Sequence, residues 1–363
     1  MKLQALSHTS RDSNVRDFGV TLVITVATDR RGRDQRGKLI RSSSSPIDEA
    51  VRAEDVRGLA LLRRSCHHFG FKLEALREGL PFTGFGSKVL EPLRFLESAV
   101  QSGAVPGEDL VVFTDAYDTF FAASDGEIRA KLKQHFPPHS VVFSAERWCW
   151  PEENKSLEHL FPPSKTPYRF LNSGGYVGRA QDVVEVLRAA GTHPEEDDQG
   201  SLQRLFLRQE ASYGGPNPLA RARIMLDYHC HIFQPHAGQD LHDDKEALES
   251  IGPGGRWCNR VTGSVPCLFH ANGGLLMKKN AMRIVETMPW WRETSFSYNN
   301  VQKGGEIKLD SCGYDTARCA TCHQVPRSHL NEALLRCSRC KRAYYCSEIC
   351  QRADWATHRT ACR

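Results

Sequence analysis

The apolar positions of residues 20–280 alternate between short continuous runs and segments with helical spacing. The runs are mostly β-branched or aromatic, as expected of strands covered on both faces of a parallel sheet. They lie at residues 20–27, 110–113 and 140–144, and further strand candidates lie at 71–76 and 169–171. Helical spacing occurs at residues 54–69, 88–98 and 128–136. Because strands and helices alternate, we expect an α/β fold, with a mostly parallel sheet and helices on both faces.

The pattern changes at both ends of the chain. Residues 1–18 are polar and predict a disordered N-terminus, and residues 29–46 predict a loop rich in charge, Gly and Ser. The periodicity fades after residue 280, and residues 295–312 have the composition of a linker. A length of 363 residues suits one large and one small domain. We therefore predict a large domain at 19–280, a linker at 281–318 and a small module at 319–362.

The net charge of +5 is unevenly distributed. Residues 319–363 hold eight Lys/Arg and three Asp/Glu, so the rest of the chain carries equal numbers of the two signs. A neutral main body argues against a nucleic-acid surface there. The apolar run at residues 20–27 is too short to span a bilayer and lacks the flanks of a secretory signal. These features predict a soluble, intracellular protein with no nucleic-acid or membrane partner.

Two carboxylates, Asp115 and Asp118, follow the apolar run that begins at Leu110. Open α/β sheets bind ligands at the carboxyl ends of their strands, and carboxylate oxygens suit Mg²⁺, Mn²⁺ or Ca²⁺. Taken by itself, the segment suits an Asp-rich turn equally well. A phosphatase with Asp115 as its nucleophile is a third interpretation, but the spacing to Asp118 is one residue too long for a DxD motif.

Cysteine and histidine form four closely spaced pairs in the small module. The pairs are Cys319/Cys322, Cys337/Cys340, Cys346/Cys350 and His358/Cys362. Together they supply eight ligands, enough for two tetrahedral zinc sites. Because so short a segment cannot close a core, metal binding should supply most of its folding free energy.

With Tyr344, Tyr345, Gln351 and Trp355, this module closely resembles the MYND-type zinc finger. The resemblance implies interleaved ligands and a protein-interaction role, with proline-rich peptides among the expected partners. The first zinc would take Cys319, Cys322, Cys346 and Cys350, and the second would take Cys337, Cys340, His358 and Cys362. Seven zinc-bound thiolates and two zinc ions would reduce the charge of the module from +5 to +2, a weak footprint for phosphate.

The large domain carries an ordered set of short motifs. They are VITVAT at 23–28, FTDAYD at 113–118, FSAE with CWP at 143–151, FLNSGGYVG at 170–178, DDQ at 197–199, IFQ at 232–234 and HANG at 270–273. As a set, they resemble the glycosyltransferase domain of the procollagen lysyl hydroxylases over residues 20–276. The resemblance implies a GT-A fold, a UDP-sugar donor and a divalent ion, usually manganese. The acidic run is shorter than in the family, and a family lysine is missing after Gly273, so collagen is not implied as the acceptor.

The resemblance also assigns roles to individual residues. It implies manganese ligands (Asp115, Asp118, His270), residues along the uracil and nucleoside (Val26, Ala27, Thr28, Ala116, Tyr117), residues near the diphosphate (Lys88, Asn272, Gly273) and acids beside the sugar and acceptor (Asp197, Asp198). Small residues at 172–175 suggest a sharp turn at a strand end. Solvated helix starts are the alternative interpretation for Lys88 and for residues 195–198.

The leading hypothesis is a metal-dependent glycosyltransferase that moves a hexose from a UDP-sugar to a protein or small-molecule acceptor. The alternative is a catalytically silent scaffold of the same fold that recruits partners through the finger. Zinc-bound thiolates would risk oxidation in the secretory lumen, so we expect a cytoplasmic or nuclear location.

Overall fold

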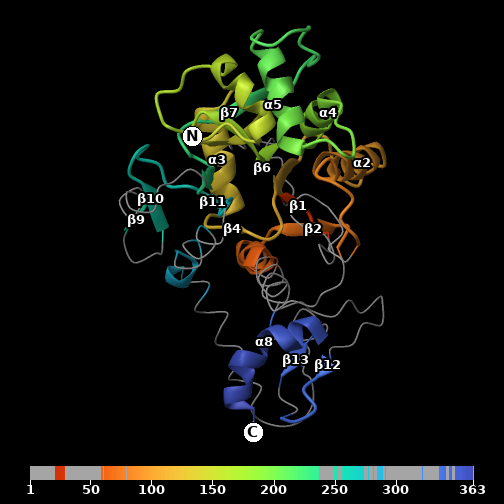
Figure 1. Cartoon of the computed structure of the whole chain (residues 1–363), viewed down its shortest axis with the longest axis vertical. Helices are drawn as coiled ribbons and strands as arrows, with labels where there is room; N and C mark the ends of the chain where they lie inside the picture. The colour runs from red at the N-terminus through yellow and green to blue at the C-terminus, as the bar shows by residue number, and fades with distance from the viewer. Residues whose placement is uncertain are drawn as a thin grey trace, which may run out of the picture.

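The large domain is built around a six-stranded sheet (Figure 1). In spatial order its strands are β2 (Lys72–Leu76), β1 (Leu22–Val26), β3 (Leu110–Thr114), β6 (Phe170–Arg179), β5 (Ser140–Glu146) and β7 (Arg223–Asp227). Strand β6 is antiparallel to both neighbours, and the other adjacent pairs are parallel. The mostly parallel α/β sheet expected from the sequence is therefore confirmed.

The structure is a computed structural model, and not every residue is described. The described residues are 21–28, 59, 61–78, 80–236, 248–251, 256–273, 277, 281, 284–288, 291, 321, 335–340, 343–345 and 348–362. The predicted disordered N-terminus, the loop at 29–46 and the linker segment 295–312 lie outside these residues.

Helices cover both faces of the sheet because successive side chains of a strand point in opposite directions. Ile24 of β1 belongs to a core shared with α2 (Ser87–Gln101), α4 (Ala180–Ala190) and α5 (Asp198–Gln209). Its neighbour Val23 packs on the other face, with α3 (Asp125–His135) and with the helical residues 61–69. The helices expected near 88–98 and 128–136 are thus present.

A second, three-stranded sheet brings late residues of the chain beside early ones. Strand β11 (Leu268–His270) pairs antiparallel with β4 (Thr119–Phe121) and parallel with β8 (Phe233–Pro235). The register of β4 and β11 sets His270 opposite Thr119. Nearby, β9 (Leu248–Ile251) and β10 (Arg256–Asn259) form an antiparallel pair, and the 3₁₀ helix η1 (Glu152–Leu160) follows β5.

The core of the large domain extends past residue 280. Four buried apolar residues pack with Phe120 and Phe269, which stack on each other across β4 and β11. They are Ala281, Ile284, Val285 and Met288. Since these side chains cover the second sheet, the domain continues where the sequence pattern places the start of a linker.

The segment 172–175 is not the expected turn but part of β6. Gly175 pairs with Thr114 of β3, and the carbonyl of Gly174 accepts a hydrogen bond from the amide of Asp115 at 3.0 Å. On the other side, the register between β5 and β6 shifts after Phe143. Pairing with β3 keeps the segment extended. Its small residues therefore allow close contacts with neighbouring groups and do not reverse the chain.

The C-terminal module has a short hairpin followed by a helix. Its elements are β12 (Leu335–Arg336), β13 (Tyr344–Tyr345) and α8 (Glu348–Ala361). The strands are antiparallel. A single helix thus carries His358 and continues almost to Cys362.

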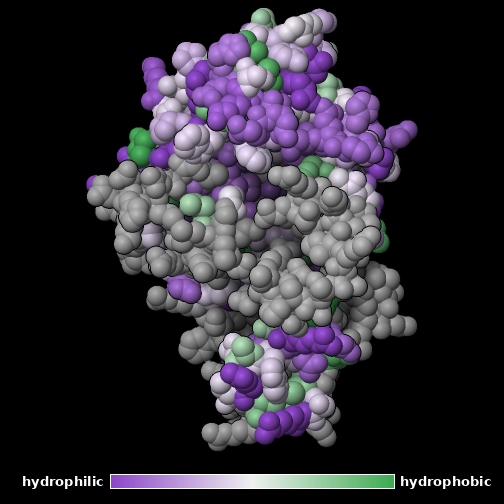
Figure 2. Space-filling model, viewed as in Figure 1, coloured by the Kyte–Doolittle hydropathy of each residue, from purple (hydrophilic) through white to green (hydrophobic). Residues whose placement is uncertain are grey.

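The described surface is mainly hydrophilic in one view of the large domain. Figure 2 shows polar side chains over the region of α4 and α5, with only isolated hydrophobic residues among them. Among the helices the structure describes, none has the length and hydrophobicity needed to cross a bilayer.

Candidate active site and zinc centre

Three metal-binding side chains converge where β3, β4 and β11 meet. Asp115 follows the last residue of β3, Asp118 precedes β4, and His270 ends β11. The amide of Ala271 donates to the carbonyl of Asp118 at 2.8 Å, which ties the two chain segments together. The ligand atoms of the three side chains all lie within 4.8 Å of one another. The structure therefore brings together the residues predicted to hold manganese.

The spacing of these atoms fits one hard divalent ion. Nε2 of His270 lies 3.4 Å from Oδ2 of Asp115 and 3.5 Å from Oδ1 of Asp118. In an octahedral site with bonds of about 2.1 Å, adjacent ligand atoms are about 3.0 Å apart. The two distances from His270 exceed this edge by about half an ångström or less, so only a small adjustment is needed between the imidazole and each carboxylate. Two carboxylates and one imidazole also leave positions open for phosphate oxygens.

The backbone of β6 makes room for this cluster. A Cβ atom on Gly174 would lie 2.1 Å from Cε1 of His270 and 3.0 Å from Oδ2 of Asp115. Both distances are too short for non-bonded contact. Asp115 and His270 can therefore lie this close together only because residue 174 is a glycine.

Charges around the cluster shift the pKa values of its members. Burial alone would raise the pKa of Asp115, but Lys88 and His270 outweigh it and hold this pKa well below its usual range. Burial alone would lower the pKa of His270, but Asp118 and Asp115 outweigh this effect and raise the pKa to about 9. In the absence of a metal, an imidazolium therefore supplies positive charge where a divalent ion would bind.

Lys88 links the metal cluster to the start of α5. Its Nζ lies 2.7 Å from Oδ1 of Asp115 and 3.3 Å from Oδ2 of Asp198. The lysine is mostly buried, so it is not the solvated helix-start residue of the alternative interpretation. Glycines before α2 let the segment that precedes α5 lie close to the start of α2. A Cβ on Gly86 would lie only 2.0 Å from the carbonyl oxygen of His193 in that segment.

The two candidate catalytic acids have different surroundings. Asp197 caps α5, because its carboxylate accepts from the amide of Gly200 at 2.8 Å, as the helix-start interpretation expects. Burial and the neighbouring Asp198 raise the pKa of Asp197 to about 6. Asp198 is buried and faces Lys88.

The predicted nucleotide-facing residues lie on neighbouring segments. Ala27 and Ala116 pack together in one small apolar cluster, with Tyr117 beside it. The hydroxyl of Tyr117 donates to the carbonyl of Thr28 at 2.8 Å, and Val26 ends β1. These segments lie at the carboxyl ends of β1 and β3, where open α/β sheets bind ligands.

A buried polar network lies next to the metal cluster, and it was not predicted from the sequence. Glu146 accepts hydrogen bonds from Asn172 at 3.0 Å, Gln199 at 2.8 Å and Asn272 at 2.9 Å. Asn272 therefore uses its amide within the network, and Gly273 beside it has a φ of 107°, a backbone conformation that favours glycine. A polar Asn172 inside a buried strand was the available signal, since such residues need specific partners.

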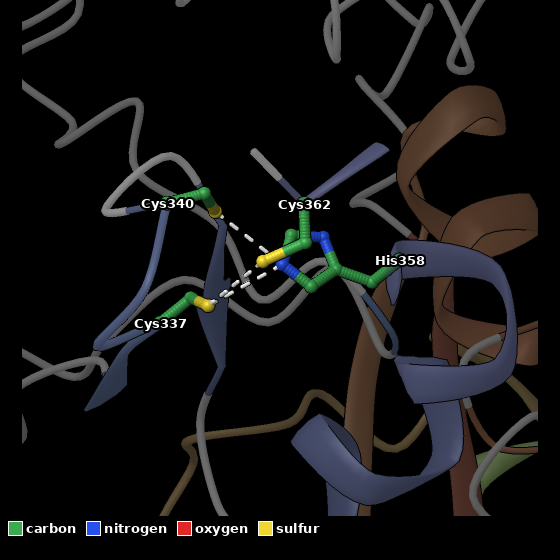
Figure 3. Close-up of side chains that lie close together, drawn as sticks. All are labelled: Cys337, Cys340, His358 and Cys362. Atoms are coloured by element: carbon green, nitrogen blue, oxygen red, sulfur yellow. Dashed lines mark hydrogen bonds between the residues drawn. The ribbon is translucent and has the colours of Figure 1, made fainter. Parts of the chain in front are cut away.

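The second candidate zinc site of the C-terminal module is fully described. Sγ of Cys337 lies 3.8 Å from Sγ of Cys362, and Nε2 of His358 lies 3.3 Å and 3.4 Å from the sulfurs of Cys340 and Cys337 (Figure 3). Zinc with Zn–S bonds of about 2.3 Å places two tetrahedral sulfurs about 3.8 Å apart. These four side chains therefore have the spacing of a Cys₃His zinc site.

The first zinc set lies mostly outside the described residues. Cys319, Cys322 and Cys346 are not described, whereas Cys350 is described and buried. The interleaved assignment of its ligands stays a prediction.

The α/β sheet, the Asp–Asp–His cluster at its strand ends and the cysteine–histidine cluster define a glycosyltransferase-type domain joined to a zinc module. Sequence comparison names the family. The model of the PLOD GT domain matches residues 49–294, and that of the MYND finger matches residues 319–362. The chain thus belongs to the PLOD GT domain family and carries a C-terminal MYND finger.

Several characterised and uncharacterised proteins are similar to the large domain. Procollagen-lysine,2-oxoglutarate 5-dioxygenase 1 of Pongo abelii is 29% identical over 67% of this chain and 32% of its own length. The multifunctional procollagen lysine hydroxylase and glycosyltransferase LH3 of the same organism is 27% identical over 69% and 32%. Uncharacterized protein R699 of Acanthamoeba polyphaga mimivirus is 31% identical over 52% and 36%. The chain spans about a third of the length of these relatives.

One solved structure matches this chain at low similarity. It is a glycosyltransferase involved in the glycosylation of the major capsid of PBCV-1, with 9% identity and a TM-score of 0.39. The match covers 73% of this chain and all of that one. A score this low carries no weight for function.

Proposed function

We propose that the large domain is a manganese-dependent glycosyltransferase that transfers a hexose from a UDP-sugar to a protein or small-molecule acceptor. The observation that carries the proposal is the convergence of Asp115, Asp118 and His270 beside Gly174, which has no side chain to separate them. Partly burying two carboxylates is costly, and the fold does not need three ligand-type side chains at one point. A cation site explains their arrangement.

In this proposal Asp115, Asp118 and His270 would hold the ion. When bound, manganese supplies positive charge that stabilises a diphosphate leaving group. Lys88 adds a second positive charge beside Asp115 and suits the same diphosphate. The carboxyl ends of β1 and β3, with Val26, Ala27 and Thr28 on the first, bind the nucleoside, as the family resemblance implies.

Asp197 and Asp198 are the proposed acids beside the sugar. Lys88 contacts both Asp198 and Asp115, and this shared contact supports the proposal that Asp198 lies near the reacting centre. A carboxylate there can stabilise positive charge on the anomeric carbon or accept a proton from the acceptor. The MYND finger recruits a protein, with proline-rich peptides as the proposed class.

The test is a screen for UDP release from UDP-sugars with manganese. Asp115→Asn should abolish turnover, because it weakens both the metal site and the Lys88 ion pair. The matched control is Asp125→Asn, which removes a carboxylate paired with Arg129 at 2.8 Å outside the site. Turnover that survives in Asp115→Asn would contradict the proposal.

The same variant separates an enzyme from the scaffold of the alternative hypothesis. A scaffold would capture its protein partner through the finger and would show no manganese-dependent UDP release in the unmodified chain. An enzyme loses turnover in Asp115→Asn and keeps partner capture.

A further inference from the structure

The side-chain amide of Asn172 has only one orientation that satisfies its neighbours. Its Nδ2 donates to Oε1 of Glu146 at 3.0 Å and to Oε1 of Gln199 at 3.2 Å. Its Oδ1 accepts from the backbone amide of Gly174 at 3.1 Å. Rotating the amide by 180° would set its NH₂ group against the N–H of Gly174 and its oxygen against a carboxylate. Both contacts would be repulsive.

Backbone groups of fixed polarity also orient the partner amide of Gln199. Its Oε1 accepts from the amide of Ser173 at 3.1 Å, and its Nε2 donates to the carbonyl of Trp150 at 2.7 Å. A backbone N–H cannot accept and a carbonyl cannot donate, so this orientation is unambiguous. The orientation of Asn172 follows from groups on three elements.

His270 receives its hydrogen-bond partner from this network. Nδ1 of its ring lies 3.2 Å from Oδ1 of Asn172. Because Oδ1 can only accept, Nδ1 must carry the proton. Nε2 is then the ring nitrogen left for a metal, and it is the atom that faces Asp115 and Asp118.

We infer that Asn172 is a positioning residue for the metal site: its carbonyl oxygen fixes the proton of His270 on Nδ1 and turns Nε2 toward the ion. Glu146 and Gln199 act one step further out by holding the amide of Asn172. The inference rests on the proposed function, since it concerns the same ion. Hydrogen-bond partners of ligating histidines typically contribute about 10–100-fold in metal affinity.

Burial makes this control effective. Asn172, Glu146 and His270 are each less than 5% exposed, so water does not readily replace a lost partner. Glu146 also accepts from Asn272, whose Oδ1 accepts from the amide of His236 at 2.8 Å. The network thus joins β5 and β6 to the chain that follows β11.

The test compares Asn172→Leu with a matched variant elsewhere. Asn259 is equally buried and also makes four hydrogen bonds, with Nδ2 donating to Tyr168 and Gln234 and Oδ1 accepting from two backbone amides. None of these four bonds involves His270. Manganese affinity, measured by calorimetry or electron paramagnetic resonance, should fall about 10–100-fold in Asn172→Leu and stay within about twofold in Asn259→Leu.

A dependence on metal concentration separates positioning from a general loss of structure. UDP release by Asn172→Leu should return when manganese is raised to saturate the variant, whereas a smaller folded fraction would not be rescued. Equal manganese affinity in the unmodified chain and Asn172→Leu overturns the inference and leaves the proposed function standing. Absence of manganese binding in the unmodified chain overturns the proposed function as well.

One further measurement, on the unmodified chain, decides the matter if Asn172→Leu does not fold. In the ¹⁵N spectrum of the magnesium-saturated protein, His270 should show a protonated Nδ1 and an unprotonated Nε2. A ring protonated at Nε2 and not at Nδ1 overturns the inference.

Discussion

Replacing Gly174 with alanine should close the space between His270 and Asp115. The added Cβ would lie 2.1 Å from Cε1 and 2.7 Å from Nδ1 of the His270 ring, and 3.0 Å from Oδ2 of Asp115. Carbon atoms make favourable contact at about 3.5–4.0 Å, so the ring must move by more than an ångström. Metal sites keep their ligand distances within about 0.2 Å. The substitution should therefore disrupt ion binding far more than the fold.

The cost to folding follows from overpacking. Inserting one methyl group into a packed core typically costs about 1–3 kcal/mol, which for a domain of this size corresponds to a fall in Tm of about 2–12 °C. Manganese affinity should fall by more than about tenfold, since each 1.4 kcal/mol of lost ligand geometry is tenfold. Calorimetry of manganese binding and thermal unfolding without metal give the two quantities.

Gly175 is the matched control, because a Cβ added there would meet Phe233 and not His270 or Asp115. A Cβ there would lie 2.8 Å from Cδ1 of Phe233, so Gly175→Ala should also lower Tm. Its manganese affinity should stay within about threefold of the unmodified chain. The reasoning is refuted if Gly174→Ala binds manganese normally, or if both variants lose affinity equally.

Three further predictions concern charge and zinc. Lys88→Met removes the cation that pairs with both Asp115 and the buried Asp198, so the unfolding free energy without metal should fall by about 3 kcal/mol. Manganese should raise Tm more in the variant than in the unmodified chain, and an equal manganese shift contradicts this. Burial alone would raise the pKa of Glu127, but Arg256 and Lys131 outweigh this effect and lower the pKa from 4.5 to about 2. The ionised carboxylate therefore stabilises the fold fully above pH 4.5, and this stabilisation is lost as the pH falls toward about 2. Urea unfolding at pH 7 should give the unmodified chain a higher free energy of unfolding than Glu127→Gln, and this difference should shrink below pH 4.5. A difference at pH 3 equal to that at pH 7 argues against the prediction. Chelation should unfold the MYND finger, seen as a loss of helical circular dichroism, and Cys340→Ser should lower the zinc content from two ions to one; unchanged zinc content would rule out its role as a ligand.

The parts of the fold set by local pattern were predictable from sequence. Strands β1 and β3 are continuous apolar runs, and α2 and α3 have helical spacing, so their positions follow from neighbouring residues. The position of Asp115 at a strand end is equally local. The role of His270 as a metal ligand could be predicted only from the ordered set of motifs, because nothing near it in the sequence indicates which distant carboxylates it contacts.

Other features depend on tertiary contacts that local patterns do not encode. The small residues at 172–175 suggested a turn, but pairing with β3 keeps them extended, and their size serves the close approach of His270. The domain continues past residue 280 because Ile284 and Val285 cover the second sheet. The amide pairing of Asn172 with Gln199 joins a strand to a helix, and only the folded chain reveals it.

Calorimetric titration of UDP into the protein, with and without manganese, tests the central claim most directly. The arrangement of Asp115, Asp118 and His270 predicts that UDP binds with manganese, that affinity falls sharply without the ion, and that Asp115→Asn loses the manganese-dependent part. Absence of UDP binding in the presence of manganese would contradict the proposal that this cluster is a nucleotide-sugar site.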